Sequence, residues 1–248
     1  MGHLDDEGQA LKRTLAFAAL AVVVAAICIR LGFWQLRRLR ERREINARLV
    51  AHLAEPQADL VTLRADSSSR LRRARVSGTP DYAHEIVLAA RSYEGSPGVY
   101  LFTPLRVAGH DSAFLVNRGW VYAADGVSVQ RDRWRERDTN FTGYAELMPL
   151  QGSPVLDAPL RGDSLLVRVL NPTTVRRALP YPVSPLYLVA TLADSSIPAD
   201  RRVARLGAPV VDDGPHLSYA IQWFSFATVA IVGAIAVVLQ RRGGERSL

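Results

Sequence analysis

The chain has a single cysteine, Cys28, which lies inside a long apolar run near the N-terminus. One thiol cannot form an intrachain disulfide, and it cannot supply the pair of thiols with which cysteine-based carriers hold copper or zinc. The sequence therefore excludes delivery of copper through paired cysteines. Cys28 itself is interpreted as a small apolar residue that faces lipid or a neighbouring helix.

Lysine is also nearly absent, because Lys12 is the only one, and the net charge of +7 therefore depends on arginine. A general compositional preference for arginine is the simplest explanation. The alternative is recognition of carboxylates, including cofactor propionates, by planar guanidinium groups. No aromatic residues alternate with the basic ones and no nucleic-acid-binding motif is present, so we expect no nucleic-acid partner.

Charge is missing from two long segments. Residues 219–239 contain no charged side chain, and residues 14–36 contain only Arg30. At about 1.5 Å per helical residue, each segment is long enough to cross about 30 Å of hydrocarbon. The first segment runs into Trp34 and a run of arginines without a cleavage site of small residues, so we interpret it as an uncleaved anchor.

Two transmembrane helices, at 14–36 and 216–239, leave the tails 1–13 and 240–248 on one side of a membrane and residues 37–215 on the other. Arginines near the spans are more numerous in the large segment than in the tails, and a plain count would keep that segment in the cytoplasm. However, the charge rule applies to short loops, and long domains cross membranes largely regardless of charge. Charge alone leaves the orientation open.

The segment between the spans begins as a helix and continues as strands. A stripe of leucines over residues 37–55 predicts a helical extension of the first span, which Pro56 ends. The rest, residues 70–211, reads as a β-rich core in which short runs alternate with turn residues. The predicted strands are 73–77, 85–90, 99–107, 114–121, 142–147, 165–170 and 186–191.

The fold class that we predict is a membrane protein in which two transmembrane α-helices flank a mostly antiparallel β domain (α+β). Residues 99–107 and 114–121 form the expected hairpin. Proline cannot donate a hydrogen bond to a neighbouring strand, so Pro104 is expected at a sheet edge or a bulge.

The start of the second span contains three candidate ligand-binding side chains, His216, Tyr219 and Trp223. Spacings of three and seven residues put them on one face of a helix. A metal-competent imidazole with two large aromatic rings below it indicates a flat ligand or a partner helix. Alternatively, His216 contacts a headgroup or the backbone, and the aromatic residues form an interfacial belt with Trp34.

Three segments resemble those of the surfeit locus protein 1 family, which comprises assembly factors of cytochrome c oxidase. The first is LGFWQLRRL at residues 31–39, where the first span ends. The second combines residues 93–105 with VNRGWV at 116–121, and the third is HLSYAIQWFSF at 216–226. The order of these segments, with one span at each end, extends the resemblance over nearly the whole chain.

The resemblance implies an assembly factor for an aa3-type haem–copper oxidase that catalyses no reaction itself. It implies that haem a is held or presented during maturation of the haem-bearing subunit, with that subunit and the haem a synthesis machinery as partners. His216 corresponds to the family's histidine, the axial ligand of the haem iron, with Tyr219 and Trp223 as a wall for the porphyrin. The implied location is a bacterial plasma membrane, with the β domain outside the cytoplasm and both termini inside.

Arg30 and the motif around Arg118 each allow two interpretations. A charge inside a span is costly, so Arg30 either snorkels to the interface or supports an acidic group such as a haem propionate or a partner carboxylate. The motif is either a strand end with a glycine bulge or a surface that contacts a partner. The residues expected to bind a partner are Trp34, Asn117, Arg118 and Trp120.

Two other functions remain open from the sequence. A purely structural anchor would bind oxidase subunits without a cofactor. A serine esterase would use Ser164, in Gly-Asp-Ser-Leu, as the nucleophile, His216 as the base and Asp213 to orient that base. Such a nucleophile normally follows an early strand of an alternating α/β sheet, and this chain lacks that alternation, so we expect Ser164 to be unreactive.

Overall fold

The computed structural model describes residues 2–150, 155–192, 198, 201–208 and 211–244. Met1 and residues 245–248, at the ends of the two predicted tails, lie outside the described residues. The chain divides into two compact units. One, called the helix pair below, comprises residues 1–47 and 212–248, and the other, the sheet domain, comprises residues 48–211.

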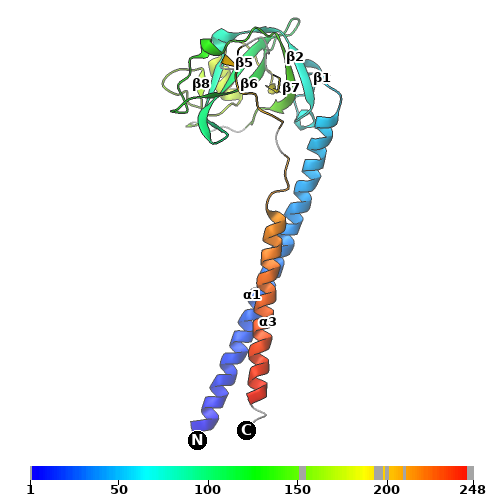
Figure 1. The fold of residues 1–248 in the computed structure, drawn as a ribbon, viewed down its shortest axis with the longest axis vertical. Coiled ribbons are helices and arrows are strands. Elements are labelled where there is room, and N and C mark those ends of the chain that lie inside the picture. The colour runs from blue at the N-terminus through cyan, green and yellow to red at the C-terminus, as the bar shows by residue number, and fades with distance from the viewer. Residues whose placement is uncertain (1, 151–154, 193–197, 199–200, 209–210, 245–248) are drawn as a thin grey trace. The chain divides into compact units, whose positions relative to one another are not determined.

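The helix pair is built from helix α1 (Gly2–Ala54) and helix α3 (His216–Gly244), which run alongside each other (Figure 1). Residues 48–54, at the end of α1, are counted with the sheet domain. Both are long and apolar enough to cross a membrane, with mean hydropathies of 2.5 and 2.0 in their most apolar windows. Helix α1 ends at Ala54, close to Pro56, as the sequence predicts, because a proline disfavours helical geometry in the residue before it.

The sheet domain contains one mixed sheet in the order β1-β2-β7-β9-β6-β5-β4-β8, and β3 pairs with β5 beside β4. The strands are β1 (Ala58–Asp59), β2 (Arg73–Ser77), β3 (Thr79–Pro80), β4 (Ile86–Tyr93), β5 (Ser96–Arg106), β6 (Phe114–Tyr122), β7 (Asn140–Leu147), β8 (Leu166–Val167) and β9 (Leu186–Ala190). All seven predicted strands are present, with boundaries shifted by up to three residues.

The expectation of a mostly antiparallel sheet was partly wrong. Three pairs are parallel: β1 with β2, β4 with β8, and β6 with β9. Alternation of apolar and polar residues identifies a strand but not its direction relative to its neighbours. The partners in these pairs come from distant parts of the chain, so no turn signal reveals them.

Strands β5 and β6 form the predicted antiparallel hairpin. Pro104 lies inside β5, not at an edge of the sheet. On its other side, however, the neighbouring strand is interrupted, because the 3-10 turn Tyr82–His84 separates β3 from β4. There the carbonyl of Pro104 accepts a hydrogen bond from the backbone N–H of Asp81. Pro104 has no N–H to donate, and this is tolerated because it faces the interruption between β3 and β4.

Helix α2 (Pro172–Ala178) was not predicted, although its start has a local signal. Asn171 caps it by accepting hydrogen bonds from two backbone N–H groups. In return, the side-chain oxygen of Thr174 accepts a hydrogen bond from the backbone N–H of Asn171. Proline at the first helical position fits the same signal, because its missing N–H has no helical partner in any case. A seven-residue helix is too short to show hydrophobic periodicity.

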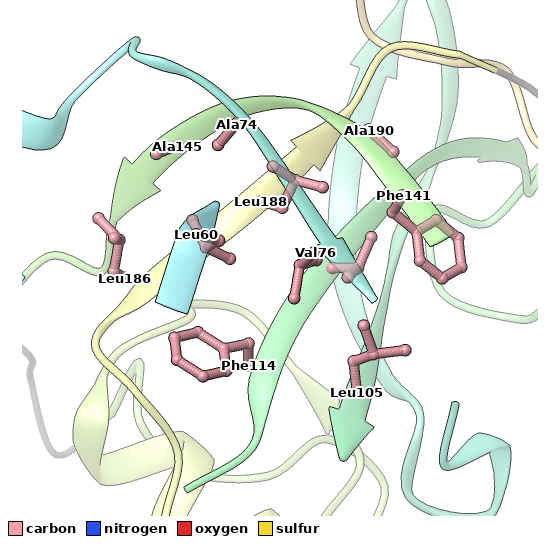
Figure 2. Close-up of a cluster of buried hydrophobic side chains, with 11 residues drawn as sticks. Leu60, Ala74, Val76, Leu105, Phe114, Phe141, Ala145, Leu186, Leu188 and Ala190 are labelled. Carbon is pink, nitrogen blue, oxygen red and sulfur yellow. The ribbon is translucent and has the colours of Figure 1, made fainter. Parts of the chain in front are cut away.

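The core of the sheet domain consists of three large clusters of buried apolar side chains and a smaller one around Leu71, Tyr144 and Val189. Figure 2 shows one of them, which gathers residues from β2, β5, β6, β7 and β9 around Leu60 of a 3-10 turn. Burial of a leucine or phenylalanine contributes about 1.5–3 kcal/mol, so these clusters hold the strands in register. These clusters therefore position the buried side chains of the sheet domain that are described below, such as Arg118.

Candidate functional site

The helix pair packs through a seam of small side chains. Ala25 and Cys28 of α1 are buried against Ala227 of α3. The buried residues of α1 recur at alternating spacings of three and four, and those of α3, Ala220, Ala227 and Ala234, recur every seven residues. Both patterns fit the seven-residue repeat of two helices that wrap around each other. Small residues let the two backbones approach closely without a polar contact. Cys28 is thus a seam residue, as its interpretation as a small apolar side chain anticipated.

Gly32 lies farther along the same seam and admits an aromatic ring. A Cβ atom at this position would lie 2.7 Å from the ring of Phe224. The same Phe224 ring packs edge-on against Phe33, with ring centroids 5.4 Å apart. The first and third segments of the family resemblance, nearly two hundred residues apart in sequence, therefore contact each other directly.

At the start of α3 the seam becomes polar. The Nδ1 atom of His216 lies 2.9 Å from Oε1 of Gln35, whose side chain is only 9% exposed. An amide oxygen only accepts hydrogen bonds, so the imidazole donates through Nδ1. The other ring nitrogen, Nε2, has no hydrogen-bond partner among the residues that the structure describes, and a Cβ atom at Gly214 would lie 3.7 Å from it.

The residues just before His216 are held to α1 by a polar clamp. Arg43 donates from Nε to Asp213 at 2.8 Å, and Asn46 donates to the carbonyl of Asp212 at 2.7 Å. The hydrogen bond from Arg43 holds the pKa of the Asp213 carboxyl below its usual value. The clamp fixes the backbone that leads into α3, and hence the position from which the imidazole of His216 projects.

The other two residues of the predicted face are placed differently. Trp223 packs against Ala25, Cys28 and Ala227, so it lies in the seam on the same side of α3 as His216. Tyr219 is 45% exposed and lies at the margin of that face. The seam thus brings His216 and Trp223 towards α1 and leaves Tyr219 accessible to lipid or to another molecule.

Arg30 and Trp34 lie on the outer surface of α1. Both side chains are exposed, Trp34 by 46%, and they are one helical turn apart. Within the described part of the chain, Arg30 makes no hydrogen bond or ion pair. Because Gln35 is level with the start of α3, Arg30 lies about 7.5 Å deeper along α1. This guanidinium is therefore open to a group outside the chain.

In β6, the motif Asn117-Arg118-Gly119-Trp120 forms a bulge. Leu101 of β5 faces Gly119 while the next residue, Phe102, faces Asn117, so Arg118 is the extra residue. Gly119 has φ +127°, and a Cβ atom there would lie 2.1 Å from the carbonyl oxygen of Ala204. The bulge turns the side chain of Arg118 into the domain, which favours the structural interpretation of the motif.

Arg118 is the centre of a buried ionic network. Its side chain is 0% exposed and forms an ion pair with Glu85, while Thr103 donates to the same carboxylate oxygen at 2.6 Å. Glu136 lies 3.8 Å from Arg118 and accepts a hydrogen bond from Arg205 at 2.8 Å. Burial lowers the pKa of Arg118. The negative charges of Glu85 and Glu136 raise it by more, so the net shift is upward.

Trp120 and Asn117 also have roles inside the domain. The ring of Trp120 lies against Gly98, where a Cβ atom would come within 2.2 Å of its Nε1. It also packs against Tyr93 at a tilt, with ring centroids 5.5 Å apart. Asn117 is buried and accepts a hydrogen bond from the N–H of Gly119. Of this motif, only Trp120 keeps partial exposure for contact with a partner, and that role stays a prediction.

The arrangement does not support a serine esterase. Asp213 is paired with Arg43, and Nδ1 of His216 is bound to Gln35, so Asp213 does not orient the imidazole. Ser164 lies in a turn before β8, and its neighbour Asp163 pairs with Arg131. The described residues also contain no group of three or more His, Cys, Asp and Glu side chains that would hold a metal ion.

Sequence reasoning missed the residues that position His216 and Arg118. Gln35 is inside the first family-like segment, but spacing along the chain gives no sign that it meets a histidine 181 residues away. Glu85, Glu136 and Arg205 read as ordinary charged residues of loops and strand ends. A polar residue in the small-residue repeat of α1 is the one signal that could have identified Gln35.

Comparison with known proteins gives a consistent result. The model of the SURF1 family matches residues 22–228. A SURF1-like protein of Monosiga brevicollis is 29% identical over 246 residues, covering 94% of this chain and 90% of that protein. A SURF1-like protein of Rickettsia conorii is 27% identical, with 90% of both chains covered. A SURF1-like protein of Mycobacterium tuberculosis is 29% identical over 88% of this chain and 81% of its own length.

Proposed function

Because the chain belongs to the SURF1 family, we propose that it assists assembly of an aa3-type haem–copper cytochrome c oxidase by holding haem a for the haem-bearing subunit. The family is known generally as one of cytochrome oxidase assembly factors. In this proposal the protein catalyses no reaction, and haem a is its cargo. Its partners are the haem-bearing subunit and the enzymes that synthesise haem a.

The observation that carries the proposal is the environment of His216. A neutral imidazole binds haem iron through one nitrogen while the other donates to an acceptor. His216 meets both conditions, because Nδ1 donates to Gln35 and Nε2 has no partner among the described residues. Gly214 leaves room beside Nε2, since a side chain at that position would begin 3.7 Å from it.

The surrounding residues suit an amphipathic, flat molecule. Trp223 lies about two turns below His216 in the seam, and Tyr219 offers an exposed ring and hydroxyl beside it. Arg30 provides a guanidinium on the outer surface of α1, where it can pair with a propionate or with a carboxylate of a partner subunit. Trp34 and Trp120 are the exposed or half-exposed aromatic residues that we assign to partner contact.

The proposal also places the protein in the plasma membrane of a bacterium, with α1 and α3 as spans and both termini in the cytoplasm. Two helices of sufficient length and apolarity support two spans. The sheet domain would then lie outside the cytoplasm. This orientation opposes the plain count of arginines, and it is therefore open to a direct test.

A topology reporter distinguishes the two orientations. We expect a reporter that is active only in the cytoplasm to be inactive when inserted at Ser68, an exposed residue of a 3-10 turn in the sheet domain. The same reporter attached after residue 248 should be active, which controls for expression. Strong activity at Ser68, in a protein that still supports oxidase assembly, would reverse the proposed topology.

The haem-holding role is tested by the visible spectrum of protein purified from cells that also make the haem a biosynthetic enzymes. We expect a Soret band in the wild type, loss of most of it in His216→Ala, and a shifted band in His216→Met, because thioether sulfur is a weaker ligand. His110→Ala, at an exposed histidine of the sheet domain, is the matched control. Unchanged spectra in both His216 variants would refute haem ligation by this residue.

The second candidate is a scaffold that binds oxidase subunits without haem. The exposed face of α1 with Arg30 and Trp34 favours it, because this face suits a membrane helix with a carboxylate as well as it suits a propionate. The scaffold requires no metal ligand, so it predicts that His216→Ala assembles oxidase normally. The two candidates are therefore separated by the same histidine.

A further inference from the structure

The polar contact between α1 and α3 is unusual for its position. Deeper along the helix pair the seam consists of alanine, glycine and cysteine, which pack without hydrogen bonds. On the other side of Gln35, the next buried residue of α1 is Leu39, and the polar clamp follows it. Gln35 is buried, and its amide oxygen is bonded to His216. Without His216, this buried oxygen would have lost its hydrogen bonds to water and gained none in return. An unpaired buried amide costs about 1–3 kcal/mol. A leucine at this position would pack the seam at no such cost, so glutamine serves something other than packing.

We propose that Gln35 is a positioning residue that fixes the tautomer and the orientation of His216. This inference rests on the proposed function, in which Nε2 of His216 receives the haem iron. With Nδ1–H held by Oε1 of Gln35 at 2.9 Å, the proton of the neutral ring is on Nδ1 and the lone pair is on Nε2. The ring thus presents the nitrogen that a haem can use.

The surroundings of the pair show that the orientation is defined on more than one side. The clamp of Arg43 and Asn46 on residues 212 and 213 fixes the backbone before the ring. Gly32, one turn before Gln35, lets Phe224 settle into the seam and so sets the rotation of α3 against α1. Beside Nε2 there is Gly214, which has no side chain to cover it. These contacts leave Nε2 as the imidazole nitrogen without a hydrogen bond to the described residues, and they fix the direction in which it points.

A hydrogen bond to the second nitrogen of a ligating histidine also makes that histidine a better ligand, because the acceptor increases the basicity of the ring. Gln35 therefore affects both affinity and the electronic properties of bound iron. A residue with a packing role would affect neither in a graded way. The acceptor strength at position 35 is the variable that separates the two roles.

The test compares Gln35→Leu, which has similar size and no acceptor, with Gln35→Glu, which keeps an acceptor and strengthens it. Gln222→Leu, at an exposed glutamine of α3, is the matched control. The full-length variants are placed in lipid nanodiscs. The first measurement needs no haem: ¹⁵N NMR of labelled histidine, with His216 assigned by its loss in His216→Ala. We expect the Nδ1–H tautomer in the wild type and in Gln222→Leu, and loss of that preference in Gln35→Leu.

The second measurement is titration with haemin, followed by the reduction potential of the loaded protein. We expect Gln35→Leu to bind haemin about 10- to 100-fold more weakly than the wild type. Gln35→Glu should retain binding and lower the potential, because a carboxylate acceptor makes the ring more basic. A packing role does not predict that Gln35→Glu keeps the binding that Gln35→Leu loses and at the same time lowers the reduction potential.

The outcomes separate the two proposals. If His216→Ala weakens haemin binding while Gln35→Leu keeps the wild-type tautomer, affinity and potential, the role of Gln35 is wrong and the haem site stands. If His216→Ala binds haemin as the wild type does, the haem site itself is wrong. In that case, a changed tautomer in Gln35→Leu would show only that the two side chains are hydrogen-bonded.

Discussion

Replacing Arg118 with methionine should lower the free energy of unfolding of the sheet domain by about 3–5 kcal/mol, because it removes one partner of a buried ion pair. Glu85 is 1% exposed and would keep its charge without the guanidinium that compensates it. Glu136 would retain only Arg205. Methionine fills part of the volume of arginine, so the expected loss comes mainly from the unpaired carboxylate and less from a cavity.

Urea unfolding of the full-length protein in detergent, followed by near-ultraviolet circular dichroism, measures this loss. Arg64→Met is the control, since Arg64 also pairs with an aspartate but is 86% exposed. An exposed pair contributes up to about 1 kcal/mol, so this variant should unfold nearly as the wild type does. The double variant Arg118→Met, Glu85→Leu should recover part of the stability, because no carboxylate is left alone at that end of the network.

A loss in Arg118→Met no larger than that in Arg64→Met would contradict this interpretation. It would mean that the carboxylates are accommodated without Arg118, by water or by protonation. The motif in β6 would then have no structural explanation, and a role for Arg118 in partner binding would have to be reconsidered. The double variant is informative in either case, because it separates the charge effect from the packing effect.

The strands could be predicted from the sequence because their signal is local. Each strand is a short run of strand-favouring residues between turn residues, and Arg73–Ser77, in which exposed and buried residues alternate, was identified to the residue. The direction of β9 beside β6 could not be predicted, because it depends on contacts between residues about seventy positions apart. The same holds for Arg118, where one extra residue in β6 inverts the direction of a side chain that reads as a surface charge.

The spacing along α3 predicts only part of how the candidate site residues are placed. His216 and Trp223 share a helix face, as a spacing of seven requires, but Tyr219 lies at its margin, since three residues fall 60° short of a full turn. The sequence left open whether Arg30 snorkels to the interface or supports an acidic group, and in the structure its side chain is on the outer surface of α1. The seam decides these placements, and it depends on which small residues of α1 and α3 meet. The contact of Gln35 with His216 could be recognised only once the pairing of the two helices was known.

In cells, loss of the imidazole of His216 should remove most of the haem a that reaches the oxidase. In the proposed site, Trp223 would still contact the haem through its ring, but it could not replace the axial bond to iron that His216 would give. Helix α3 should still form and insert, because alanine is a strong helix former and α3 has enough apolar residues beyond position 216. The expected defect is therefore in haem supply, with normal amounts of the protein itself.

The most direct measurement is the haem a content of the oxidase in membranes of a strain that lacks this protein and carries either the wild-type chain or His216→Ala, with His110→Ala as control. Immunoblots establish equal amounts of each variant. The account predicts several-fold less haem a per oxidase subunit with His216→Ala and a normal content with the wild type and the control. A normal content with His216→Ala, at an equal amount of protein, would contradict the central claim and leave the scaffold as the function.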